Sequence, residues 1–423
     1  MKSVRAGCFL LGVCLFAGTQ DSEFNVNTRY TVEAVLVSGD GWTTNLAADH
    51  DSEERLSPSL RKQILGLIGD KLNPSELDDL ASKLRRELRA RTVTHRVLRG
   101  LKPQYVQVLF EVKMRPVRFD VSVPQLLYSS SQGFSGSAEA IATVAEHHVF
   151  SFGVLSDGDQ LVERSSGITA RYEDTHALSE RVRLGFEFAS YQELWNRSTR
   201  NAWTAAGNSA SDLYRTRQVF QPEVTFVLAR PLTLSLGASL EQLDEAAPGG
   251  QSESANALAS TLRYRRRLDD SDFQQDFDAD YSLRAASRLW ASDFVYLRHS
   301  WAFRYTLLHG RHSVSDRASG GLLLGHAPLF ERFVLGNSTS LRGWDRYEID
   351  PLGGNRVVHN SVEYRYRLFE SFYDSGAVWN AGEPVILRHS IGMGLHQGPL
   401  FVAVAFPVRK GAADPVFMVG MNY

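Results

Sequence analysis

The sequence of 423 residues contains only two cysteines, Cys8 and Cys14. After residue 14, therefore, the chain can form no disulfide, thiol nucleophile or cysteine-based metal site, and mispairing in an oxidising compartment is avoided. The formal net charge is -2, so the strongly basic balance that is typical of nucleic-acid-binding proteins is missing. We expect no nucleic-acid partner.

Signatures of catalysis and of cofactor binding are also missing. The sequence has no His-Glu-x-x-His or Gly-x-Ser-x-Gly motif and no zinc-finger or phosphate-loop spacing. The adjacent histidines His147 and His148 fit the end of a strand better than a pair of metal ligands. We therefore predict no catalytic residue, no cofactor, no metal and a function that is not enzymatic.

The sequence has no apolar run long enough for a transmembrane helix. Its nearly continuous apolar run, Cys8 to Phe16, is shorter than the about 20 residues that spanning requires. Two basic residues precede this run and small residues follow it, which predicts a secretory signal peptide over residues 1–20. A lipoprotein signal ending at Cys14 is an alternative, although the small residue expected before such a cysteine is missing. Residues 21–29 form a polar linker.

An α+β pattern follows over residues 30–115. Ser57-Pro58 and Asn73-Pro74 are typical of helix starts, because a polar cap precedes proline at the first helical position. The predicted elements are a strand over residues 30–39, helices over 57–69 and 73–91, and strands over 93–97 and 105–112. The order strand, helix, helix, strand, strand predicts one small domain.

Residues 116–423 lose helical periodicity and show repeated alternation of apolar and polar residues. Leucines alternate with small polar residues from Leu232 to Leu240, and apolar residues alternate with Arg and Glu from Arg181 to Phe188. Such strands suit a transmembrane β-barrel, which has lipid outside and water inside. A soluble sandwich would give the same period, but the signal peptide, the length of the runs and the chain terminus favour the barrel. We count 15 or 16 runs, and the even-number rule favours 16 strands.

Two polar insertions and the chain terminus complete the barrel pattern. Asn196 to Leu213 and Asp244 to Ser254 are rich in turn-forming residues and are predicted to be extracellular loops. The chain ends with alternating apolar residues that share one face of a strand: Phe417, Val419, Met421 and Tyr423.

The tetrapeptide Leu341-Arg342-Gly343-Trp344 lies in a long irregular segment, Gly336 to Gly354. A non-strand segment of this length is usually functional or disordered, and its charged and aromatic composition indicates a packed loop. Two strand-like motifs follow, Asn360 to Arg365 and Phe372 to Trp379. Together the three motifs resemble the BamA-like superfamily of outer-membrane insertases and translocases, also called the bacterial surface antigen family. Trp344 stands where that family usually has Phe or Tyr.

The resemblance implies a bacterial outer-membrane barrel with a POTRA domain (residues 30–115) in the periplasm, before a barrel over residues 116–423. It implies that the loop folds back into the lumen and places Arg342 against Glu363 and Asp374, whose carboxylates suit the planar guanidinium. Gly376 shares a face with Asp374 and leaves space for the loop. A solvated charge pair in the lumen is the alternative. The terminal residues resemble the signal by which such barrels are recognised for assembly.

The implied function is insertion or translocation of polypeptides without covalent catalysis. The implied partners are unfolded outer-membrane or secreted polypeptides, outer-membrane lipid, and periplasmic chaperones or assembly lipoproteins. Alternatives are a dedicated secretion pore of the two-partner type and a passive or structural barrel. The essential insertase of the family usually has five POTRA copies and the dedicated pores have two, so a single copy leaves the subfamily open.

Overall fold

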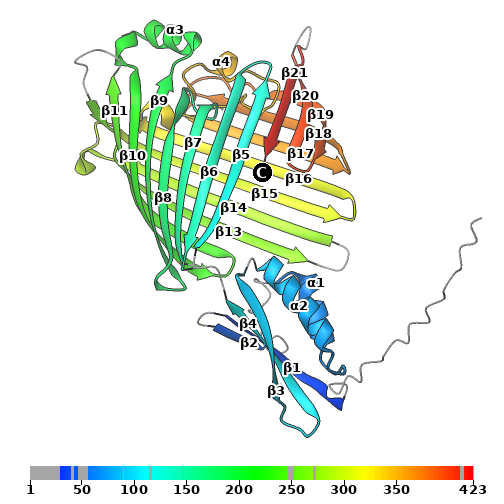
Figure 1. The fold of residues 1–423 in the computed structure, drawn as a ribbon. Coiled ribbons are helices and arrows are strands. Elements are labelled where there is room, and N and C mark those ends of the chain that lie inside the picture. Colours follow the sequence, from blue (N-terminus) through cyan, green and yellow to red (C-terminus); the bar gives the residue numbers. More distant parts are fainter. Residues whose placement is uncertain are drawn as a thin grey trace, which may run out of the picture. The chain divides into compact units, whose positions relative to one another are not determined.

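The computed structural model (Figure 1) describes residues 29–39, 42–45, 56–88, 90–113, 117–145, 147–245, 252–269, 273–409 and 414–422. The chain forms two compact units, residues 1–115 and residues 116–423. The predicted signal peptide and all but the last residue of the predicted linker lie outside the described residues.

The N-terminal unit contains two helices and a four-stranded sheet. Its elements are β1 (Thr31–Gly39), β2 (Trp42–Asn45), α1 (Pro58–Gly66), α2 (Pro74–Glu87), β3 (Thr92–Arg99) and β4 (Tyr105–Lys113). The strand order is β2-β1-β4-β3, with β1 parallel to β4. The Ser57 and Asn73 side chains accept hydrogen bonds from the first turns of the two helices. The apolar stripes of both helices, including Ile64 and Leu84, pack with Val35, Val108 and Phe110 of the sheet into one core.

Two local predictions for this unit differ from the structure. Strand β2 was not predicted, although Gly39 pairs with Trp42 and the two residues between them are Asp-Gly, a favoured hairpin dipeptide. Helix α2 ends at Glu87, whereas the predicted end was residue 91. The reason is that the Arg91 amide donates to the carbonyl of Lys113, so the chain has already entered the sheet.

Sixteen antiparallel strands of the described chain close the barrel, which confirms the predicted number. They are β5 (Val117–Ser129), β6 (Gly133–Val144), β7 (His148–Gly158), β8 (Arg164–Ser179), β9 (Val182–Leu194), β10 (Tyr214–Ala229), β11 (Leu232–Glu245), β13 (Ala257–Asp269), β14 (Phe273–Ala286), β15 (Val295–His309), β16 (His312–His326), β17 (Arg356–Tyr366), β18 (Phe369–Trp379), β19 (Arg388–Gln397), β20 (Leu400–Pro407) and β21 (Val416–Asn422). The short β12 (Ser252–Ser254) pairs only with β11. Antiparallel closure joins β21 to β5.

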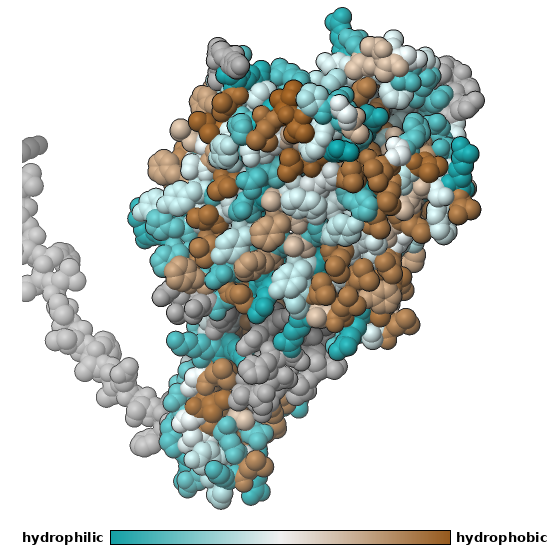
Figure 2. Space-filling view, turned by 180° about the vertical axis from the view of Figure 1, so that it is seen from behind, coloured by the Kyte–Doolittle hydropathy of each residue, from teal (hydrophilic) through white to brown (hydrophobic). Residues whose placement is uncertain are grey.

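The two faces of the wall differ as the alternation predicts. Phe186, Phe188, Leu236 and Leu240 are exposed on the outside, and apolar side chains recur among polar ones over the barrel face seen in Figure 2. The alternate positions, such as Glu187, point into the lumen, where Glu187 meets Arg171. None of the described helices is long and apolar enough to cross a bilayer.

The two ends of the barrel also differ. At one end, the turn end, short connections such as Gly310-Arg311 join the strands. At the other, the loop end, the longer connections carry helical turns: α3 (Arg197–Ala205), η3 (Ala210–Asp212), η4 (Arg288–Trp290), η5 (Leu329–Glu331) and α4 (Arg346–Ile349).

Both predicted loops contain more order than expected. The segment 196–213 holds α3, whose buried Thr199 donates a 2.9 Å hydrogen bond to the carbonyl of Pro351. In the segment 244–254, β11 continues to Glu245 and β12 pairs back onto it, so both ends of this predicted loop are sheet.

Candidate functional site

The segment between β16 and β17, residues 327–355, folds into the loop end of the barrel; we call it the lumenal loop. Phe333 and Gly354 exchange two 2.9 Å backbone hydrogen bonds that close its neck. Side chains from both the loop and the wall form one buried apolar cluster, including Phe330, Leu335 and Leu341 of the loop and Tyr296 and Val378 of the wall. The loop is therefore packed against the wall.

A tight turn within this loop aims Arg342 at the wall. The Asn337 side chain accepts hydrogen bonds from the amides of Thr339 and Ser340 at 3.0 and 2.8 Å. Leu341 and Gly343 both have positive φ, 34° and 90°, and a Cβ on Gly343 would lie 3.1 Å from Cβ of Ala405. This position needs glycine because of both its backbone conformation and its close approach to β20.

The Arg342 guanidinium binds Asp374 with two parallel hydrogen bonds. Nε donates to one carboxylate oxygen at 2.9 Å and Nη2 to the other at 2.8 Å, and the Arg342 amide adds a third at 3.0 Å. Nη1 lies 2.9 Å from Glu363, and the guanidinium stacks 3.6 Å from the Phe372 ring. The side chains are 0% exposed for Asp374 and 3% for Glu363. The Arg342 side chain itself is 11% exposed, so the three charged groups lie away from bulk solvent.

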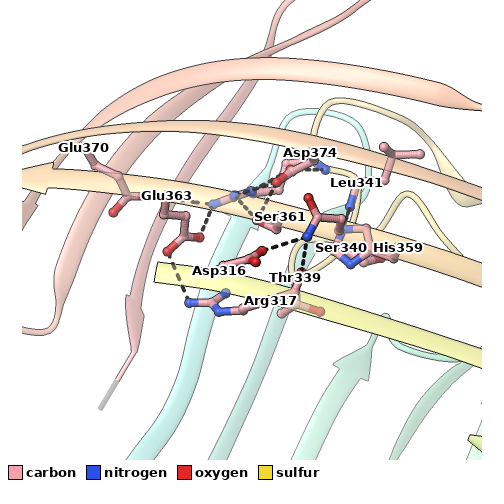
Figure 3. Close-up of polar contacts among 12 residues, drawn as sticks. Asp316, Arg317, Thr339, Ser340, Leu341, His359, Ser361, Glu363, Glu370 and Asp374 are labelled. Atoms are coloured by element: carbon pink, nitrogen blue, oxygen red, sulfur yellow. Dashed lines mark hydrogen bonds and ion pairs between the residues drawn. The ribbon is translucent and has the colours of Figure 1, made fainter. Parts of the chain in front are cut away.

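Further charges surround this cluster, as Figure 3 shows. Ser361 donates to Asp374 at 2.7 Å, and Arg317 and Arg365 approach Glu363 at 3.2 and 3.6 Å. With Glu370, three arginines face three carboxylates. Burial by itself lowers the pKa of Arg342, but hydrogen bonding to Asp374 and the nearby carboxylates outweigh it and raise the pKa above its ordinary value. Arg342 therefore stays charged.

Trp344 and Gly376 fix the loop on either side of Arg342. The Trp344 indole donates a 2.9 Å hydrogen bond to the carbonyl of His389, and its ring lies under Arg409 at 4.6 Å. A Cβ on Gly376 would lie 2.9 Å from Leu335 of the loop and 2.8 Å from the carbonyl of Val358. The structure thus brings together Arg342, Glu363 and Asp374, with Trp344 and Gly376 at the border of the cluster.

Residues 151–420 match the Omp85 superfamily domain. The chain belongs to the Omp85 superfamily. It is therefore an outer-membrane β-barrel protein. Over 136 residues it is 29% identical to the outer membrane protein assembly factor BamA of Nitratidesulfovibrio vulgaris; the match covers 25% of this chain and only 17% of that protein.

Two solved structures show the same fold. BamA from Haemophilus ducreyi lacking POTRA domains 1–3 aligns with a TM-score of 0.58 at 16% identity, over 93% of this chain and 85% of the other. CdiB from Acinetobacter baumannii aligns with a TM-score of 0.52 at 15% identity, over 93% and 74%.

The seam of this Omp85 barrel is short. In the described chain β21 pairs with β5 at five positions, from Met418 opposite Ser129 to Asn422 opposite Gln125, whereas β15 and β16 pair at fifteen. Phe417 and Val419 are exposed on the outer face, and Met421 is half-buried. Tyr423, the last residue of the predicted assembly signal, lies outside the described residues.

Sequence reasoning missed several residues that complete the cluster. Ser361 lies two positions before Glu363, so the period of the strand could have placed it on the same lumenal face. Arg317 lies on β16 and faces Ser361 across the register. The His359 ring accepts a 3.1 Å hydrogen bond from the Leu341 amide. For Arg317 the alternation of β16 gives the inward face but not the partner, because the pairing register of two strands is not a local property.

Proposed function

We propose that this protein inserts polypeptides into the outer membrane, or translocates them across it, without covalent catalysis, and that its N-terminal unit is a single POTRA domain in the periplasm. In this assignment the turn end faces the periplasm and the loop end faces outward, which follows the usual placement of short turns in such barrels. Unfolded outer-membrane or secreted polypeptides are the clients.

The short seam carries this proposal. Residues Val117–Ser122 of β5 pair with β6 on one side and have no partner strand on the other within the described residues. Pro124 follows and lacks an amide donor. An unpaired strand edge presents backbone donors and acceptors to an incoming strand. A client strand can therefore pair with β5 beyond the end of β21 and then extend along β5 by displacing the five pairs of the seam.

The N-terminal unit offers a second strand edge. The described sheet ends in the four-residue β2 on one side and in the eight-residue β3 on the other, so β3 presents the longer free edge. Val97 and Leu98 of β3 are exposed, as is the adjacent Leu101. This edge suits transient pairing with an extended polypeptide.

A passive open pore fits less well. The lumenal loop shares a buried apolar cluster with the wall and places Arg342 among five charged side chains of the wall. A loop packed in this way fills lumen that a wide diffusion channel leaves to water.

The test is to lock the seam. Tyr128 and Val419 are opposite each other and both exposed, and both natural cysteines fall in the predicted signal peptide. Liposomes carrying Tyr128→Cys/Val419→Cys are given a urea-unfolded eight-stranded outer-membrane barrel, and its folding is followed by heat-modifiable migration on gels. We expect the reduced protein to accelerate folding and the oxidised protein to lose that acceleration.

The matched control is Ala140→Cys/Phe152→Cys, which joins opposite residues of β6 and β7 away from the seam. Oxidation of this control should leave acceleration unchanged. Protease protection of the client inside the liposomes, without folding in the membrane, would indicate translocation. A protein that promotes neither process is a passive barrel, and that result would refute the proposal.

A further inference from the structure

A second charged cluster lies at the loop end of the lumen, apart from the Arg342 cluster. It is a row of six side chains that alternate in sign. Consecutive members of the row are Glu193 and Arg217 at 3.1 Å, Arg217 and Glu241 at 3.6 Å, Glu241 and Arg284 at 2.6 Å, Arg284 and Glu331 at 2.9 Å, and Glu331 and Arg298 at 3.4 Å. Three carboxylates thus balance three arginines.

The row is complete only when the lumenal loop is in place. Five members belong to the wall strands β9, β10, β11, β14 and β15, and Glu331 alone belongs to the loop. Without Glu331 the wall would hold three arginines and two carboxylates. The side chains of Glu193, Glu241 and Glu331 are 0%, 1% and 3% exposed. An unbalanced charge at this depth is costly, because water cannot replace the missing partner.

The wall residues that contact Glu331, which we call the seat of Glu331, have the chemistry of a carboxylate-binding site. Arg284 and Arg298 lie on its two oxygens, and the Tyr296 hydroxyl donates a 2.9 Å hydrogen bond to one of them. Arg298 also donates to the backbone carbonyl of Glu331 at 2.9 Å.

Aromatic residues of the loop flank this seat. Phe330 lies under the Arg217 guanidinium at 4.7 Å, and Phe333 lies under Arg298 at 4.5 Å. Both rings belong to the apolar cluster that joins the loop to the wall. Arg298 therefore both pairs with Glu331 and stacks on Phe333, so loss of the carboxylate also disturbs this aromatic contact.

We propose that Arg284, Arg298 and Tyr296 form a carboxylate-binding site on the barrel wall, that Glu331 is its resident ligand, and that occupation of this site keeps the loop end of the lumen closed. Arg342 holds one part of the lumenal loop on β17 and β18, and Glu331 holds another on β14 and β15. Closure of the loop end does not depend on whether the protein inserts client polypeptides, so the two proposals are tested separately.

Ion conductance across planar bilayers tests the site. Glu331→Gln keeps the shape of the side chain and removes its charge, and we expect open events to become at least about tenfold more frequent. The matched control is Glu348→Gln on the same loop, whose 54% exposed side chain pairs with the partly exposed Arg409 at 2.7 Å. This control should conduct like the wild type. A folded Glu331→Gln protein that stays as closed as the wild type would overturn the proposal.

Chemical rescue separates carboxylate binding from simple packing. Glu331→Ala should open frequently in chloride, and added propionate at constant ionic strength should restore closure in a saturable way, because propionate supplies the missing carboxylate. A variant that opens but ignores propionate refutes the binding site. If the Glu331 variants do not fold, as judged by heat-modifiable migration, Arg298→Gln is measured in their place. This change removes the last arginine of the row and leaves Glu331 intact. Increased opening of Arg298→Gln supports the proposal, and wild-type closure overturns it.

Discussion

Replacement of Arg342 by alanine should loosen the lumenal loop and lower the stability of the barrel. The change removes both side-chain hydrogen bonds to Asp374 and the 2.9 Å contact with Glu363. Asp374 would keep the Arg342 amide and the Ser361 hydroxyl as donors, while Glu363 would keep Arg317 and Arg365. Removal of one partner from a buried ion pair typically costs about 3–5 kcal/mol. Because both carboxylates keep some partners, we expect the lower part of that range, about 3 kcal/mol.

Two conservative changes distinguish the guanidinium from a generic positive charge. Arg342→Lys keeps the charge, but one ammonium cannot reproduce the paired bonds to Asp374 while also reaching Glu363, so we expect a loss of about 1–2 kcal/mol. Asp374→Asn keeps the shape and removes the charge, which should reproduce much of the alanine defect. The double variant Arg342→Ala/Asp374→Asn should be less damaged than the sum of its parts by about 1–3 kcal/mol, because the partners share one network.

Stability is measured for the four variants and the wild type by urea titration of the detergent-folded protein, with heat-modifiable migration as the readout. Assembly of the unfolded client barrel in liposomes is measured in parallel. The N-terminal unit should keep its resistance to protease in every variant. If the stability loss of the double variant equals the sum of the losses of the two single variants, the cluster does not act as a unit. An Arg342→Lys protein as stable and active as the wild type would show the same.

Three further outcomes follow from single sites. Burial raises the pKa of Glu163, in the connection before β8, from 4.5 to about 7. Because the folded protein then binds this proton more tightly than the unfolded chain does, protonation of Glu163 adds at most about 3 kcal/mol to the free energy of unfolding. This contribution is fully present below pH 4.5 and is lost as the pH rises through 7. Glu163→Gln should flatten this part of the stability profile in urea titrations from pH 4 to 8, and an unchanged slope contradicts the assignment. Gly376→Ala should cost about 1–3 kcal/mol, because its Cβ would lie 2.9 Å from Leu335 and 2.8 Å from the carbonyl of Val358. The control is Gly185→Ala on β9, where the added Cβ would meet only Glu223, at 3.9 Å; an equal loss there contradicts the steric explanation. Protease added to intact cells should cut within residues 196–213 and leave residues 30–115 intact, whereas cleavage of the N-terminal unit contradicts the periplasmic placement.

The fold class and the faces of the strands follow from local sequence. Alternation from Leu232 to Leu240 places leucines outside and small polar residues inside, because successive side chains on a strand point to opposite faces. The same rule places Glu363 and Asp374 in the lumen. The helices of the N-terminal unit follow from their caps and apolar stripes, and the missed strand β2 had a local signal in its Asp-Gly dipeptide.

The partners across the barrel do not follow from local sequence. The alternation of apolar and polar residues predicts that Arg317 and Glu363 both face inward, but their 3.2 Å contact depends on the register of β16 against β17. The row from Glu193 to Arg298 joins residues of five strands and one loop, and no spacing along the chain relates them. The five-pair seam likewise results from how β21 meets β5 when the barrel closes.

The sequence by itself determined that this chain is a barrel with an Arg342-bearing loop, because period-two alternation and a short ordered set of motifs are local properties. Only the tertiary structure decided that the loop is held at two places, at Asp374 and at Glu331. Strand register and barrel closure bring together side chains far apart in sequence, and the burial that closure produces makes their charges depend on one another.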